Sequence, residues 1–168
     1  MRNKKKLNLK KIKIKYKSYQ VDQSGKIEQT NKVTIIAFSN TKNGSIKLLA
    51  KDKRYLQKIY RQAGKSKIYI FQVFSALLYL LLEKSKIGRA IIVIDKEYPG
   101  QEALIKSYLT QLVQKRGRIK LNFDELRFDF IGKGSNAHGV ASRAYKINRA
   151  NYIASKEEIL SLILLYEK

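Results

Sequence analysis

The stretch Ile91-Ile92-Val93-Ile94-Asp95 decides how the rest of the chain is interpreted. Four β-branched apolar residues in a row predict a strand that is buried on both faces, as in the middle of a parallel sheet. The run ends on a carboxylate, and open α/β sheets bind their ligands at the carboxyl ends of their strands. Because a bare carboxylate beside a core is costly without a partner, we interpret Asp95 as a functional residue.

A second stretch with the same pattern is Tyr19-Gln20-Val21-Asp22-Gln23-Ser24-Gly25, a strand-like segment that ends in an acid and a turn. An aspartate before a turn often serves only to cap that turn. Both interpretations of Asp22 stay open at this point. With Asp95, it suggests metal-assisted chemistry on a polyanion.

The charge of the chain points to the kind of partner. Its 168 residues include 36 Lys and Arg against 13 Asp and Glu, which gives a net charge of +23. So large a surplus calls for an acidic partner, with nucleic acid as the first candidate and a membrane surface as the second. The absence of Cys excludes disulfides, thiolate catalysis and Cys-based zinc sites.

The longest apolar segment, 68–82, is interrupted by Gln72 and Ser75 and is shorter than the ~18 residues that span a bilayer. No apolar signal core follows the basic first residues. These features predict a cytoplasmic protein that does not engage a membrane. The length predicts one domain over 16–168, preceded by a basic arm or edge strand at 1–15.

The arm ends in the alternating segment Lys11-Ile12-Lys13-Ile14-Lys15-Tyr16-Lys17. Alternation with a period of two is typical of a strand with one apolar and one basic face. Lysines on such a strand either block edge-to-edge aggregation or contact phosphates, and the sequence leaves both roles open.

Along the domain, apolar periodicity and turn residues predict strands and helices. The expected strands are 16–22, 32–38, 45–50, 89–95 and 126–131, and the expected helices are 52–62, 66–84, 101–115, 137–148 and one that begins after Ser155. Asp52 is expected to cap the first helix, and Ser155 with Glu158 forms a capping box. A short strand at 68–71 is an alternative to the start of the second helix. The order predicts an α/β fold in which three antiparallel strands, followed by parallel strands, form a mixed sheet flanked by helices.

This order, with an acid at the end of the first and fourth strands, resembles the ribonuclease H-like superfamily, which includes ribonucleases H, RuvC-type resolvases and transposases. Val21-Asp22-Gln23-Ser24-Gly25 is similar to the Asp-Glu-Ser-Gly opening of an uncharacterised family in that superfamily, with Gln23 as a departure. The segment 134–141, Gly-Ser-Asn-Ala-His-Gly-Val-Ala, resembles the closing helix, where such proteins carry a final Asp or His. The resemblance covers roughly residues 16–148.

The resemblance implies a metal-dependent nuclease that hydrolyses phosphodiester bonds of structured or hybrid nucleic acid. Two Mg²⁺ or Mn²⁺ ions about 3.5–4 Å apart would be held by carboxylates, the ligands that hard cations favour. Asp22, Asp95 and His138 are the expected catalytic residues and metal ligands. Glu97 and Glu102 are spare acids just beyond the fourth strand, and Glu97 is expected as a further metal ligand.

One feature of that superfamily is missing from this chain. Its members usually carry a Glu on the first long helix, where this chain has Gln72, with Glu83 only at the far end. An alternative is therefore a non-catalytic RNA- or DNA-binding protein that keeps the fold with a degraded site. A small basic component of a ribonucleoprotein particle is a third candidate.

Basic residues near the predicted site and in the arm are the expected contacts to nucleic acid. Such residues bind phosphates without reading base sequence. They are Lys11, Lys13, Lys15, Lys26, Lys133, Arg143 and Lys146. The sequence does not distinguish RNA, DNA and hybrid substrates, and it does not predict protein partners or the oligomeric state.

Overall fold

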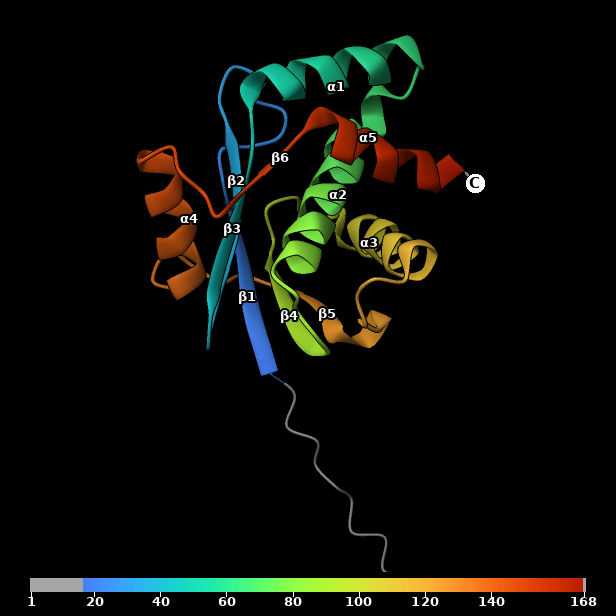
Figure 1. Ribbon diagram of the computed structural model, residues 1–168. Helices are drawn as coiled ribbons and strands as arrows, with labels where there is room; N and C mark the ends of the chain where they lie inside the picture. Colours follow the sequence, from blue (N-terminus) through green and yellow to red (C-terminus); the bar gives the residue numbers. More distant parts are fainter. Residues whose placement is uncertain (1–16, 168) are drawn as a thin grey trace, which may run out of the picture.

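The computed structural model describes residues 17–167, which form a six-stranded sheet with helices on both faces (Figure 1). The strands are β1 (Lys17–Ser24), β2 (Thr34–Ser39), β3 (Asn43–Leu48), β4 (Ala90–Asp95), β5 (Leu126–Asp129) and β6 (Tyr152–Ala154). Their order in the sheet is β5-β4-β1-β2-β3-β6. β1, β2 and β3 are antiparallel, whereas β4 is parallel to β1, β5 to β4 and β6 to β3. The expected α/β fold with a mixed sheet is thus confirmed.

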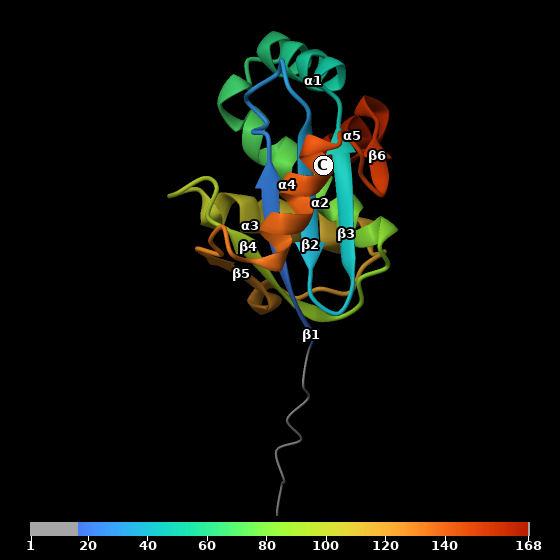
Figure 2. The same ribbon diagram turned by 90° about the vertical axis from the view of Figure 1, so that its left-hand side faces the viewer.

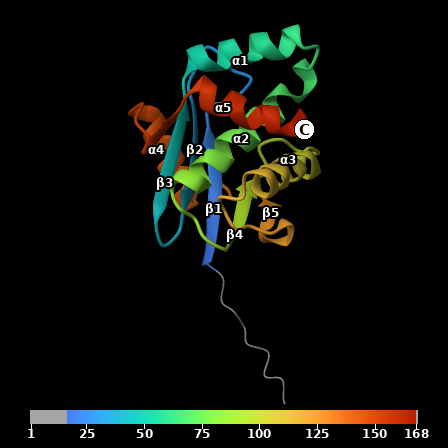
Figure 3. The ribbon, with the colours of Figure 1, turned by 45° about the vertical axis from the view of Figure 1, so that its right-hand side comes forward.

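The helices divide unequally between the two faces of the sheet. They are α1 (Ala50–Gln62), α2 (Tyr69–Lys84), α3 (Glu102–Arg116), α4 (Asn136–Lys146) and α5 (Lys156–Ile163). α4 packs on β1, β2 and β3 from one side, as Figure 2 shows face-on. α2, α3 and α5 lie together on the other side, where α2 packs against both α3 and α5 (Figure 3).

α2 is the centre of the hydrophobic core. Twelve of its sixteen residues are buried, because the sheet, α3 and α5 surround it. The segment Ser66–Lys84 is long and apolar enough to cross a membrane by length and composition, but 67% of that window is buried inside the protein. Its apolar character is therefore explained by its place in the core. The alternative strand at 68–71 is wrong, because Ser66–Ile68 is a 3₁₀ turn that leads into α2.

Some boundaries differ from those expected. α1 begins at Ala50, so Asp52 lies in its first turn, where it complements the helix dipole, and is not the N-cap. β1 extends to Ser24, which places Asp22 inside the strand. The capping box of α5 is confirmed: the Ser155 hydroxyl accepts the N–H of Glu158 at 3.1 Å, and the Glu158 carboxylate accepts the N–H of Ser155 at 2.9 Å.

The expected alternating strand 11–17 falls outside the described residues except for Lys17, which begins β1. β6 was not expected from the sequence.

Candidate metal centre

The sheet register brings the two predicted aspartates together. Val21 of β1 is paired with Ile94 of β4, so Asp22 and Asp95 follow at neighbouring positions of adjacent parallel strands. One carboxylate oxygen from each of Asp22, Asp95 and Glu97 lies within 4.8 Å of the other two. The expected meeting of the two aspartates is confirmed, and Glu97 completes a cluster of three carboxylates. We call these three residues the acidic cluster.

Asp22 is the most buried member of the cluster, with 4% of its surface exposed. One oxygen accepts the N–H of Gln23 at 2.8 Å, and the other lies 2.7 Å from Nδ1 of His138. That backbone bond goes to the adjacent residue, and Asp22 does not close the turn that follows. Gln23 does so, because its side-chain amide donates to the carbonyl of Gly25 at 3.0 Å.

Gly25 is required at that turn. Its φ is +75°, and an added Cβ would lie 2.2 Å from the carbonyl oxygen of Val33. The turn directs the chain from β1 into the loop that carries Lys26 and Glu28. Lys53 holds this loop: its buried ammonium donates to the carbonyls of Lys26 and Gln29 at 2.9 and 2.8 Å. Burial lowers the pKa of Lys53 to about 8, against an opposing effect of Glu28.

Asp95 and Glu97 are held by the loops at the ends of β4 and β5. The Asp95 carboxylate accepts the N–H of Ile131 at 2.8 Å, and the N–H of Glu97 donates to the Asp95 carbonyl at 2.8 Å. This second bond closes a tight turn that returns Glu97 to the end of the strand. Burial, followed by the charges of Asp22 and Asp95, raises the pKa of Glu97 to about 7.

His138 lies in the first turn of α4. The Ser135 hydroxyl caps that helix by accepting the N–H of His138 at 3.1 Å. Because its Nδ1 is occupied by Asp22, Nε2 is the nitrogen left for a ligand or a proton. His138 does not belong to the set of mutually close carboxylates. Its role as a metal ligand stays a prediction, while its contact with Asp22 is a feature of the fold.

α2 supplies no carboxylate to the acidic cluster. Gln72 accepts the Tyr60 hydroxyl at 2.6 Å in the core, and Glu83 binds Arg118 and Arg116 elsewhere. Phe71 and Phe74 instead pack edge-on against Tyr98, at 5.9 and 5.6 Å between ring centroids.

Three residues near the cluster were not expected as functional residues. Glu28 is exposed, and its charge contributes to the raised pKa of Glu97. Asp129, at the end of β5, is paired in the sheet with Asp95. Phe130 follows it and is 74% exposed, with the Lys96 ammonium 5.1 Å from its ring centroid. The sequence places Phe130 directly after an acid at a predicted strand end, and this pattern could have identified it as a candidate.

The predicted nucleic-acid contacts within the described residues are all exposed. Lys26 lies close enough to Glu97 to lower its pKa, Lys133 is in the loop before α4, and Arg143 and Lys146 are on α4. Arg143 borders a polar cavity of about 270 Å³ beside α4, whose other walls include Ser39, Asn40 and Asn136. Lys11, Lys13 and Lys15 lie outside the described residues.

Comparison with known proteins finds no relative of this chain. No family model matches the chain, and no curated protein or solved structure is significantly similar to it.

Proposed function

We propose that this protein is a metal-dependent nuclease of the ribonuclease H-like kind that hydrolyses phosphodiester bonds by a two-metal mechanism. The observation that carries the proposal is the acidic cluster, in which oxygens from Asp22, Asp95 and Glu97 lie within 4.8 Å of one another. A three-stranded antiparallel meander followed by strands parallel to its first strand supports the resemblance to that superfamily. The net charge of +23 supports a polyanionic substrate.

The donor set of the cluster fits a hard divalent cation. All three side chains offer oxygen, which Mg²⁺ and Mn²⁺ prefer, and His138 could add one nitrogen at its Nε2. Like charges this close are unfavourable without a cation. When bound, ions of this kind activate a water molecule and stabilise charge on the phosphate oxygens.

The residues of the chain hold the site in place. Asp22 is fixed between its own strand and His138, and Asp95 is fixed by the Ile131 N–H. Nε2 of His138 is also placed to exchange a proton with a ligand, because Nδ1 faces Asp22 and the side chain is 35% exposed. Lys26, Lys133 and Arg143, which are exposed, would contact phosphates of the substrate.

A cleavage assay tests the proposal. Single-stranded, double-stranded, hybrid and branched RNA and DNA are incubated with Mg²⁺ or Mn²⁺, and wild type is compared with Asp22→Asn and Asp95→Asn. Losing ~3 kcal/mol of charge stabilisation corresponds to about a 100-fold slower cleavage in either variant. Asp124→Asn is the matched control, because it removes the same charge from an exposed 3₁₀ turn outside the cluster. Equal activity in all four proteins would remove the nuclease proposal.

A second candidate is a non-catalytic RNA- or DNA-binding protein, including a ribonucleoprotein component. It is favoured by one observation: Gln72 packs against Tyr60 in the core, so α2 brings no acid to the cluster. This candidate predicts tight, salt-dependent binding in all four proteins and no cleavage in any.

A further inference from the structure

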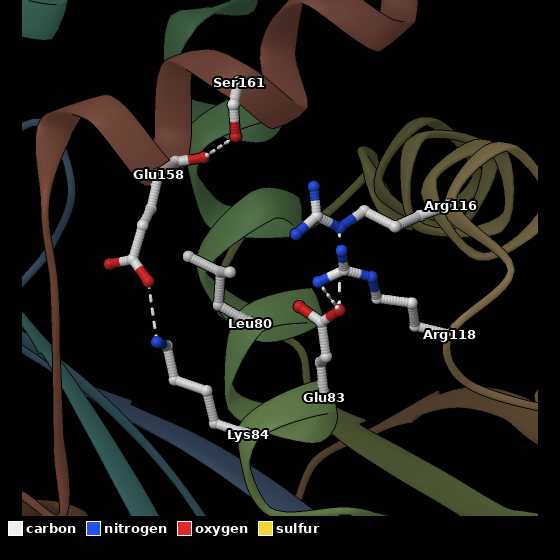
Figure 4. A pocket seen from close by; sticks show the side chains of 7 residues that line it. All are labelled: Leu80, Glu83, Lys84, Arg116, Arg118, Glu158 and Ser161. Atoms are coloured by element: carbon white, nitrogen blue, oxygen red, sulfur yellow. Dashed lines mark hydrogen bonds and ion pairs between the residues drawn. The ribbon is translucent and has the colours of Figure 1, made fainter.

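A polar cavity of about 390 Å³ lies between α2, α3 and α5 (Figure 4). Figure 4 shows Arg116 and Arg118 directed toward Glu83, and Lys84 directed toward Glu158 on the other side of Leu80. A second cavity, of about 320 Å³, shares Glu83 and Arg118 with the first and continues to Arg89 at the start of β4. Six cations line the two cavities, and we call them the basic surface: Lys84, Lys86, Arg89, Arg116, Arg118 and Lys120.

The basic surface carries more positive charge than its carboxylates neutralise. Glu83 and Glu158 line the cavities, and Glu125 pairs with Arg89 at 2.6 Å. Six cations against three carboxylates leave a surplus of three charges. Lys86 and Lys120 have no ion pair with any described residue.

The two arginines share a single carboxylate. Nη1 of Arg118 lies 3.3 Å and Nε of Arg116 lies 3.6 Å from the same oxygen of Glu83. Each guanidinium has five N–H donors, and one shared carboxylate can accept only a few of them. Nε of Arg116 is buried and has no hydrogen-bond partner among residues 17–167. A phosphate group offers the additional oxygens and negative charge that this pair lacks.

β1 begins at this same place. Lys17, the first residue of β1, is paired in the sheet with Ala90, which directly follows Arg89. Residues 1–16, which precede Lys17, contain eight Lys and Arg. The acidic cluster is at the opposite end of β4, which at ~3.3 Å per residue is about 17 Å away. The basic surface and the acidic cluster therefore lie at opposite ends of β4.

We infer that the basic surface is a second nucleic-acid-binding site, which holds the phosphate backbone apart from the acidic cluster. The inference rests on the proposed function only in taking nucleic acid as the ligand, and it requires no cleavage. A membrane surface is the less favoured partner. Peripheral binding to lipid uses apolar side chains that enter the bilayer, and none of the exposed large hydrophobic residues lines either cavity.

The test compares two double variants that remove the same charge. Arg118→Gln/Lys120→Gln removes two exposed cations of the basic surface, and Arg61→Gln/Lys67→Gln removes two exposed cations near the end of α1. Binding of a labelled duplex of about 20 base pairs, DNA or RNA, is measured by anisotropy from about 50 to 200 mM KCl. EDTA is present so that binding is measured without cleavage, and thermal unfolding verifies that both variants fold.

The first variant should bind at least about 10-fold more weakly, and its slope of log K against log salt should be shallower by about 1.8, or ~0.9 for each lost phosphate contact. The control should lose less than about half as much on a logarithmic scale. Equal loss in the two variants, or no loss in the first, would overturn the inference. So would tighter binding to phosphatidylserine vesicles than to either duplex.

The failure of this inference is distinguishable from failure of the proposed function. If Asp95→Asn abolishes cleavage while Arg118→Gln/Lys120→Gln binds like the control, only the second site is refuted. If no protein cleaves any substrate but the first variant alone loses affinity, the second site stands and the nuclease proposal falls.

Discussion

Replacement of Glu97 by Gln should stabilise the metal-free protein at pH 8. Burial and the neighbouring Asp22 and Asp95 raise the pKa of Glu97 from 4.5 to about 7. The folded protein therefore binds this proton more tightly than the unfolded chain does. The contribution to stability is fully present below pH 4.5 and is lost as the pH rises through 7. At pH 8 the folded wild type carries the whole unfavourable charge, whereas the Glu97→Gln protein has a neutral amide at this position.

The size of the effect follows from the pKa. The rise from 4.5 to about 7, at 1.36 kcal/mol for each pKa unit, gives an upper limit of ~3.4 kcal/mol, and partial exposure of Glu97 to solvent reduces it to about 1–2 kcal/mol. For a domain of this size, 1 kcal/mol shifts the Tm by about 2–4 °C. Thermal unfolding in EDTA should therefore give Glu97→Gln a Tm higher by about 2–8 °C at pH 8. At pH 4 the difference should be small, because Glu97 is then mostly protonated in both the folded and the unfolded states.

Adding Mn²⁺ or Mg²⁺ at pH 8 should reverse the order of the two proteins. An ion that binds only the folded state stabilises it by about 2.7 kcal/mol at 100 times its Kd, and the wild type keeps the carboxylate that the Glu97→Gln protein lacks. Glu157→Gln is the control, because that side chain is 71% exposed on α5. The idea that like charges are held together at this site would be refuted by either of two results. One is a lower Tm for Glu97→Gln than for wild type in EDTA at pH 8, and the other is the same Tm difference at both pH values.

Three other substitutions, and one control, test parts of the site and its supports. His138→Ala removes the 2.7 Å contact to buried Asp22, so the Tm should fall by the equivalent of about 1–3 kcal/mol. Phe130→Ala should weaken binding of single-stranded nucleic acid by about 1–3 kcal/mol through lost base stacking, with no change in Tm. Phe123→Ala, at another exposed Phe, is the control and should change neither the affinity for single-stranded nucleic acid nor the Tm. Equal losses of affinity in the two variants would argue against stacking at Phe130. Lys53→Met leaves the carbonyls of Lys26 and Gln29 without their donor, so the Tm should fall by the equivalent of about 2–5 kcal/mol. An unchanged Tm would show that the loop does not depend on Lys53.

Much of the sheet and part of the site follow from local sequence. Ile91 to Ile94 form β4 because β-branched apolar residues favour strands, but the expected burial on both faces is only partly met: Ile92 and Ile94 are buried, whereas Ile91 and Val93 on the other face are half-buried. Once β1 and β4 are neighbours and parallel, their equivalent positions meet at the same edge. The meeting of Asp22 and Asp95 could therefore be predicted from two short motifs together with the expected strand order, which placed β1 beside β4.

Other features depend on contacts that no local pattern encodes. β6 has only three residues, Tyr152–Ala154, which is too few to show a period, and it exists because β3 offers an edge. Glu97 joins the cluster through the turn closed by its own N–H, and Gln72 points to Tyr60 because α1 packs beside it. These positions are set by tertiary packing, which local preferences do not determine.

The acidic cluster differs from the ion-paired carboxylates of the fold in the partners that surround it. Three glutamates elsewhere in the fold form ion pairs: Glu158 with Lys84, Glu83 with two arginines and Glu125 with Arg89. The chain has 36 Lys and Arg for 13 acids, so a basic partner is easy to supply at any position. Among residues 17–167, however, no Lys or Arg forms an ion pair with Asp22, Asp95 or Glu97, and His138 is the one ionisable partner in contact. These three carboxylates, with oxygens within 4.8 Å of one another and no Lys or Arg paired to them, could hold a divalent ion.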